Sequence, residues 1–349
     1  MLGDISPLKE RIHGANCITL AFSNVLKYKQ YKNYKYIWKQ CGMNYIKKTN
    51  NAGYLNAKFL SITEELMLGD PIYANFVEHD SAEEMILSIK SYIDKGEPVI
   101  VFVDTFELSY HMCYKDKHAK HCLIITGYEG NTFNFVDDFY QIQDVISFET
   151  LKKSTVLRLD HDITHGIITV EIKNKLMDSK EVILSTIATN NMALEGELNI
   201  DSKVGDIEVV HKGLNGIQAF IEEYASYAMN NEFLTEDTFD DLYTILSRIS
   251  NTRYLYSSFL SREKQEFSSE LFNSLFEGYF HSGQEWKVCS NMMIKAAKAK
   301  PHKKSELFNR MIKKLHSIND LEFELLDKSK RFVEITKREV NEVLENGVK

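Results

Sequence analysis

The segment KHCLIITGYEGNTFNFVDDFY, from Lys120 to Tyr140, predicts two antiparallel strands joined by a tight turn around Gly130. The ends of such strands lie opposite each other. We therefore expect His121, which opens the first strand, to come within hydrogen-bonding distance of Asp137, which closes the second. A bulge in either strand would bring Asp138 to His121 instead, because a shift of one residue reverses which side chains face one side of the sheet.

The residues before and after this hairpin alternate between helical and strand patterns. The apolar spacing of CITLAFSNVLKY predicts a helix from about Cys17 to Tyr28. Ser81 and Glu84 form a capping-box pattern that predicts a helix ending near Gly96. The apolar run PVIVFVDTF predicts a buried strand, and GIITVEIK (166–173) predicts a further one.

The pattern changes to an almost continuous helical period from about residue 213. We therefore predict an α+β fold in three parts. They are a mixed domain over 1–160, a connector with a β element over 161–212, and an all-helical domain over 213–349.

Charge and composition exclude several classes of protein. The net charge of −8 disfavours a dedicated nucleic-acid binder, although the segments 27–40 and 295–314 are rich in lysine. We interpret 27–40 as an amphipathic helix with a solvated lysine face. No window contains the roughly 18 apolar residues of a membrane helix, and no secretory signal is apparent. The five scattered cysteines are expected to be free thiols in the cytoplasm, and no bound cofactor is indicated.

Cys17, His121 and Asp137 have the residue types of a nucleophile, a base and an orienting carboxylate. Cys17 opens a predicted helix, where the backbone N–H groups and the helix dipole lower a thiol's pKa. Asn16, or a backbone N–H at the helix start, is a candidate donor to an oxyanion. Each residue also has a structural alternative: a cysteine in an apolar helix commonly packs in a core, and a histidine or aspartate at a strand end commonly completes a turn.

A metal site is a second interpretation of the histidines near the hairpin. His111, Cys113, His118 and His121 lie within twelve residues of sequence, HMCYKDKHAKHC. Their spacing fits no standard zinc pattern, so we predict no metal.

The hairpin, with an aspartate sixteen positions after the histidine, resembles that of papain-like proteins such as the bacteriocin-leader peptidases. The chain resembles the butirosin biosynthesis protein H family more closely. HGANCITLAFSNVLKY is similar to that family's early cysteine and helix. NTRYLYSSFL (251–260) and QEWKVCSNMMIKAA (284–297) are similar to its helical domain.

The resemblance implies a papain-like N-terminal cysteine acyltransferase domain followed by a mostly helical domain. It implies that Cys17 forms an acyl-enzyme, that His121 is the base and that Asp137 orients it. The upstream glutamine that donates to the oxyanion in papain-like peptidases is not evident, so Asn16 and His13 are candidates. The doubled aspartate leaves Asp138 as an alternative.

The resemblance implies a reaction in specialised-metabolite biosynthesis, such as that of antibiotics. It would move an acyl or aminoacyl group from the phosphopantetheine thioester of an acyl carrier protein, or another thioester donor, to a small-molecule amine. The lysine-rich segments fit an acidic carrier protein. The alternatives are a cysteine peptidase or amidohydrolase with the same three residues, and a binding or assembly protein without catalysis. In the last case the helical half would form a homodimer interface. We expect no nucleic-acid or membrane partner.

Overall fold

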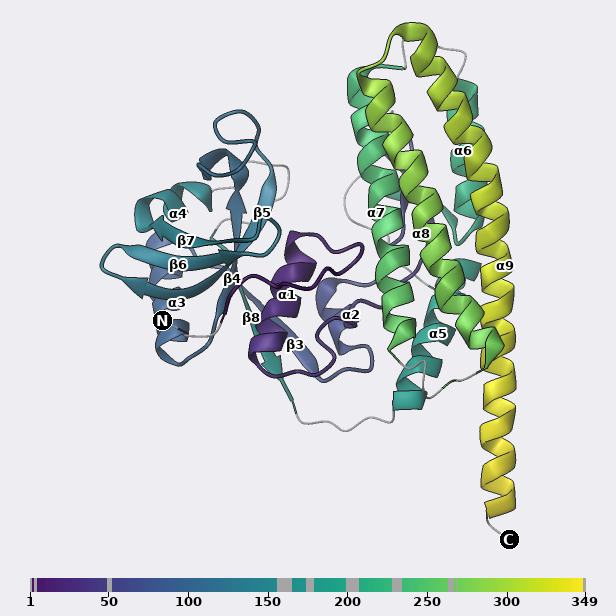
Figure 1. Ribbon diagram of the computed structural model, residues 1–349, viewed down its shortest axis with the longest axis horizontal. Coiled ribbons are helices and arrows are strands. Elements are labelled where there is room, and N and C mark those ends of the chain that lie inside the picture. The colour runs from purple at the N-terminus through teal and green to yellow at the C-terminus, as the bar shows by residue number, and fades with distance from the viewer. Residues whose placement is uncertain are drawn as a thin grey trace. The chain divides into compact units, whose positions relative to one another are not determined.

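The fold is taken from a computed structural model of the chain (Figure 1), which describes residues 2, 5–48, 52–155, 165–173, 179–198, 207–227, 234–262, 267 and 269–347. The chain forms two compact units. The first comprises Met1–Ile37 and Ile62–Leu176, and the second comprises Trp38–Ser61 and Met177–Lys349.

The first unit is built on a six-stranded sheet with the strand order β3-β8-β4-β5-β6-β7. Each pair of neighbouring strands is antiparallel. The strands are β3 (Ile72–Val77), β4 (Val99–Asp104), β5 (Lys120–Glu129), β6 (Thr132–Asp137), β7 (Ile142–Ser147) and β8 (Ile167–Ile172). The predicted hairpin is confirmed as β5 and β6, and its register shifts between Ile125 and Gly127. This bulge lies between the turn and the strand ends that carry His121 and Asp137, so it decides which side chains face the same side of the sheet at those ends.

The described part of the first unit also contains helices, which Figure 1 labels, and a short 3-10 turn. They are α1 (Cys17–Tyr28), α2 (Ile62–Met67), α3 (Ala82–Asp94), η1 (Thr105–Glu107) and α4 (Phe148–Ser154). The bounds predicted for α1 are confirmed. Ser81 caps α3 by accepting the N–H of Glu84 at 3.2 Å. The Glu84 carboxylate accepts the N–H of Asp80 and not that of Ser81, so the predicted capping box is shifted by one residue. The apolar face of α3 packs with alternate residues of β4, β5 and β6 in one core.

The second unit combines a small sheet with long helices. Its three strands, in the order β2-β1-β9, are β1 (Asn44–Lys48), β2 (Tyr54–Asn56) and β9 (Ile207–Lys212). Its helices are α5 (Ser179–Glu195), α6 (Asn215–Tyr227), α7 (Glu236–Ser261), α8 (Glu270–Ala297) and α9 (Pro301–Gly347). The helical C-terminal region is therefore confirmed. None of the helices in the described ranges is long and apolar enough to cross a membrane.

These two units differ from the division predicted as 1–160, 161–212 and 213–349. Strand β8 belongs to the first unit because it pairs with β3 and β4. Segment 38–61 belongs to the second unit because β1 pairs with β9. The predicted boundary at residue 160 lies outside the described residues.

The lysine-rich segment 27–40 was wrongly predicted to be a helix. Helix α1 ends at Tyr28, and Gln30 adopts a left-handed backbone conformation with φ of 60°. The hydroxyls of two tyrosines that follow donate to acidic side chains, Tyr31 to Asp70 and Tyr34 to Glu10. These tertiary contacts override the helical pattern of the sequence.

The two motifs of the helical half meet in the core of the second unit. Arg253 of α7 is fully buried and donates to Glu322 of α9 at 2.8 Å. Trp286 and Ser282 of α8 donate to the same Glu322 oxygen, at 3.0 and 2.6 Å. Arg253 also donates to the carbonyl of Gly42 at 3.1 Å. This network joins three helices and the segment that leads into β1.

Candidate active site

Helix α1 begins at Cys17, and its start is held by reciprocal capping. Asn16 accepts the N–H of Thr19 at 3.1 Å, and the Thr19 hydroxyl accepts the N–H of Asn16 at 2.6 Å. Cys17 is thus the first helical residue, where backbone N–H groups have no partner within the helix. The capping hydrogen bonds of Asn16 and Thr19 therefore fix the backbone that carries the Cys17 thiol.

The Cys17 thiol has the environment of a thiolate. Its pKa is lowered to about 5, first by a hydrogen bond from the Cys122 thiol and then by a hydrogen bond from His121 and its charge. The N–H of Ile18 contributes further, and burial opposes these effects. The pKa of Cys122, which is fully buried, is raised well above that of a free thiol. Cys122 therefore remains protonated and donates to Cys17.

His121 connects the thiol to Asp137. The His121 Nε2 atom lies 2.7 Å from Asp137 Oδ2, and both residues are buried. Nε2 is occupied by Asp137, so Nδ1 is the nitrogen left for Cys17. Burial lowers the pKa of His121, but the hydrogen bonds to Asp137 and Cys17 outweigh it and raise this pKa to about 9.

Four donors fix the Asp137 carboxylate. His121 and the Tyr110 hydroxyl, at 2.9 Å, bind Oδ2. The N–H groups of Phe139 and Tyr140 bind Oδ1, at 3.0 and 3.2 Å. Burial raises the pKa of Asp137, but the bonds from His121 and Tyr110 outweigh burial and lower it. The carboxylate is thus charged and cannot rotate away from His121.

Asp138 faces the other side of the sheet. It accepts the N–H of Leu8 at 2.7 Å and the Asn24 amide at 2.9 Å. Burial raises its pKa to about 6. Asp138 therefore anchors the N-terminal segment to α1, and the structure pairs His121 with Asp137.

The two other candidate residues, Asn16 and His13, are exposed. The Asn16 side-chain oxygen is committed to the cap of α1, which leaves its amide N–H₂ as the group for an oxyanion. His13 lies four residues before Cys17 in the segment that leads into α1.

Four residues around the thiol and His121 were not predicted. Cys122 could have been found as the neighbour of His121 in β5, and Tyr140 by its place three residues after Asp137. Tyr110 carries no sequence pattern that points to the site, and the sequence indicated His111 only as a candidate metal ligand. Both residues lie in the segment that joins β4 to β5.

The histidines considered for a metal site have other partners. His111 Nδ1 accepts the N–H of Cys113 at 3.0 Å, and His118 Nδ1 lies 2.5 Å from Asp104. Among the residues that the structure describes, no three His, Cys, Asp or Glu side chains form a group that could hold a metal ion.

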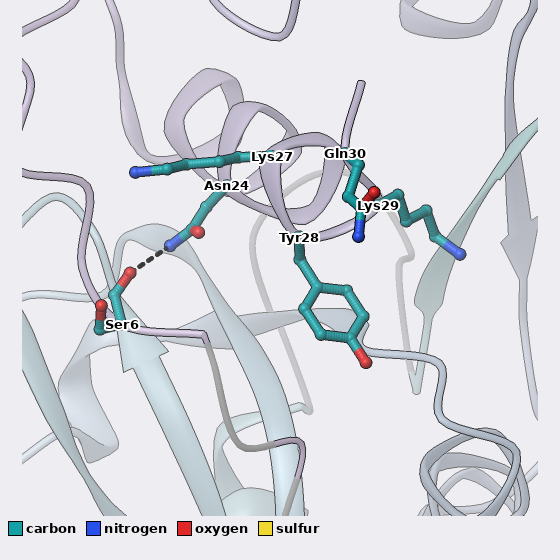
Figure 2. A pocket seen from close by; sticks show the side chains of 6 residues that line it. All are labelled: Ser6, Asn24, Lys27, Tyr28, Lys29 and Gln30. Carbon is teal, nitrogen blue, oxygen red and sulfur yellow. Dashed lines mark hydrogen bonds between the residues drawn. The ribbon is translucent and has the colours of Figure 1, made fainter. Parts of the chain in front are cut away.

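A polar pocket of about 450 Å³ lies at the other end of α1. Its lining residues are Ser6, Asn24, Lys27, Tyr28, Lys29 and Gln30. Figure 2 shows the Asn24 amide bonded to Ser6 and the two lysine side chains pointing apart. Since Cys17 is the first residue of this twelve-residue helix and Tyr28 the last, the pocket is separate from the thiol.

In chemical terms, the arrangement supplies a nucleophile and a proton carrier. A thiolate at Cys17 and an imidazolium at His121 form an ion pair between pH of about 5 and about 9. Such a pair can attack an electrophilic carbonyl carbon and return a proton to a leaving group.

A comparison with known protein families finds a match in the part of the chain that carries His121 and Asp137. Residues 33–138, just under a third of the chain, match the family model described as butirosin biosynthesis protein H, N-terminal. The match includes His121, Asp137 and Asp138 and begins after Cys17. No curated protein matches the chain. Over residues 33–138, the chain is therefore similar to the N-terminal part of the butirosin biosynthesis protein H family.

Proposed function

We propose that the chain is a cysteine-dependent acyltransferase with a papain-like catalytic unit. The observation that carries the proposal is the contact of Cys17, at a helix start, with His121, which is itself bonded to Asp137. The order of these residues along the chain, and a helix packed against the histidine-bearing strand, are typical of papain-like enzymes. The family's link to butirosin biosynthesis favours antibiotic biosynthesis as the setting.

In the first half-reaction the Cys17 thiolate attacks the carbonyl carbon of a thioester. The bond from that carbon to the donor sulfur breaks, and the departing thiolate takes the proton of the His121 imidazolium. Asp137 keeps the ring oriented and stabilises its charged form. The Cys17 backbone N–H and the Asn16 amide are the candidate donors to the oxyanion. The product is an acyl group bound as a thioester to Cys17.

In the second half-reaction an amine attacks the acyl-enzyme. Its proton passes to His121, the bond to Cys17 breaks, and an amide leaves. The donor fitting this chemistry is the phosphopantetheine thioester of an acyl carrier protein. In the basic segment 27–40, Lys27 and Lys35 contact Glu10, and Lys29 pairs with Glu97. These lysines already have acidic partners within the chain, so they offer an acidic carrier protein less unpaired charge.

A hydrolase is the second candidate, because the same three residues would serve if water replaced the amine. The test is product analysis with an acyl-N-acetylcysteamine thioester, with and without a primary amine. An amide formed by the native chain and absent with Cys17→Ala supports the transferase. Free acid as the only product, unchanged by added amine, identifies a hydrolase. No turnover with any thioester would leave the non-catalytic binding protein as the better hypothesis.

A further inference from the structure

The ring of His121 is surrounded by aromatic side chains that the reaction described above does not use. The ring centroids of His111, Tyr140 and Phe139 lie 5.6, 5.8 and 6.2 Å from that of His121. Asp137 and Cys17 bind the two nitrogens of the His121 ring. The three neighbouring rings are tilted or edge-on to it. Phe139 is 51% exposed, and His111 and Tyr140 are partly exposed. This group is therefore accessible to a small molecule.

The hydrogen bonds of His111 fix the direction of its contact with Tyr140. The N–H of Cys113 donates to Nδ1, so a neutral ring must carry its proton on Nε2. Nε2 lies 2.9 Å from the Tyr140 hydroxyl oxygen and donates to it. The hydroxyl thus keeps its own hydrogen and one lone pair for another partner.

Both members of this pair are neutral near pH 7. Burial and the charge of His121 lower the pKa of His111, with Asp137 and Cys17 opposing them. Burial raises the pKa of Tyr140. The pair therefore adds no charge that would compete with the Cys17–His121 ion pair, and its bond directions persist at the pH of the reaction.

In the proposed reaction His121 gives a proton to the departing thiolate and takes one from the incoming amine. Both groups must therefore come within hydrogen-bonding distance of its ring. The side chains that surround the ring consequently line the place where the amine enters. We propose that His111, Phe139 and Tyr140 form the subsite for the acceptor, a primary amine. This inference rests on the acyl transfer proposed above.

Within this subsite Tyr140 is a catalytic residue and His111 a positioning residue. The free lone pair of the Tyr140 oxygen accepts an N–H of the amine while the amine's own lone pair attacks the acyl carbon. The amine nitrogen becomes positively charged as it attacks, so this bond becomes charge-assisted and stronger in the transition state. The exposed Phe139 ring provides an apolar face with affinity for that charge.

The test separates the two half-reactions. Full-length protein is first acylated at Cys17 with a limiting amount of acetyl-N-acetylcysteamine. The decay of the acyl-enzyme is then followed by intact-protein mass spectrometry, in buffer alone and with n-butylamine. The variants are Tyr140→Phe, which keeps the ring, and Tyr114→Phe, a matched control in the same segment as His111 whose hydroxyl the proposal does not use. His111→Ala and His111→Gln test positioning, because the glutamine amide can again donate to Tyr140.

We expect Tyr140→Phe to slow the amine-dependent decay about ten- to a hundredfold, the range for one hydrogen bond to a charged group. Acylation and decay in buffer should fall less in Tyr140→Phe than the amine-dependent decay does. In Tyr114→Phe, acylation and both decay rates should stay within about threefold of the native rates. His111→Ala should slow amine-dependent decay, and His111→Gln should recover part of it.

An unchanged amine-dependent decay in Tyr140→Phe overturns the proposal. An equal fall of acylation and both decay rates also overturns it, because the hydroxyl would then act on the thiol or the fold. If the native chain forms no acyl-enzyme, the acyl transfer itself is wrong, and the acceptor subsite is rejected with it.

Discussion

The reactivity of Cys17 depends first on a neighbouring thiol, and Cys122→Ala tests this dependence. Cys122 is the largest cause of the low Cys17 pKa of about 5. A hydrogen bond to a charged group contributes about 1.5–3 kcal/mol, and one pKa unit corresponds to about 1.4 kcal/mol. Loss of the Cys122 donor should therefore move the midpoint of Cys17 ionisation upward by about one to two pH units. Cys122→Ser keeps a donor in place and is the matched control.

The assay is the rate of Cys17 alkylation by iodoacetamide from pH 4 to pH 10, read by peptide mass spectrometry. Circular dichroism at each pH confirms that the variants remain folded. The native chain and Cys122→Ser should share a midpoint near 5, with that of Cys122→Ala distinctly higher. Equal midpoints in the native chain and Cys122→Ala would refute the claim that the second thiol stabilises the thiolate.

Two further substitution pairs test the remaining contacts. Asp137→Asn should lower the rate of acyl-enzyme formation by about a thousandfold or more, because the amide no longer holds the imidazolium. Asp138→Asn should lower the same rate by less than about fivefold, because Asp138 binds Leu8 and Asn24. Acylation is measured by stopped flow, and equal losses of rate in the two variants would contradict the assignment of Asp137 as the orienting residue. In the second unit, Glu322→Gln leaves the buried charge of Arg253 without its partner and should cost about 3–5 kcal/mol in urea unfolding. The exposed Glu306→Gln should cost under about 1 kcal/mol, and a similar cost for both would show that the buried pair is not important for stability.

Local patterns predicted the parts of the site that depend on neighbours in sequence. A helix beginning at Cys17 follows from apolar spacing, and the approach of His121 to Asp137 follows from the geometry of a hairpin. The choice between Asp137 and Asp138 needed the structure, because it depends on where the bulge lies.

Long-range pairings could not be predicted from local patterns. β1 pairs with β9 across more than 150 residues, and no periodicity within either segment indicates that partner. Tyr110 reaches Asp137 from the connection between β4 and β5, whose path depends on contacts such as His118 with Asp104. Segment 27–40 has helical spacing. The hydrogen bonds from Tyr31 to Asp70 and from Tyr34 to Glu10 nevertheless hold it in a non-helical conformation.

The central claim is that Cys17 carries the acyl group. The most direct measurement is the intact mass of the native chain and of Cys17→Ala after incubation with acyl-N-acetylcysteamine thioesters, with peptide mapping of any adduct. The proposed function predicts one acyl adduct on the native chain, mapped to Cys17 and absent from Cys17→Ala. No adduct with any thioester, or an adduct that persists in Cys17→Ala, would contradict it.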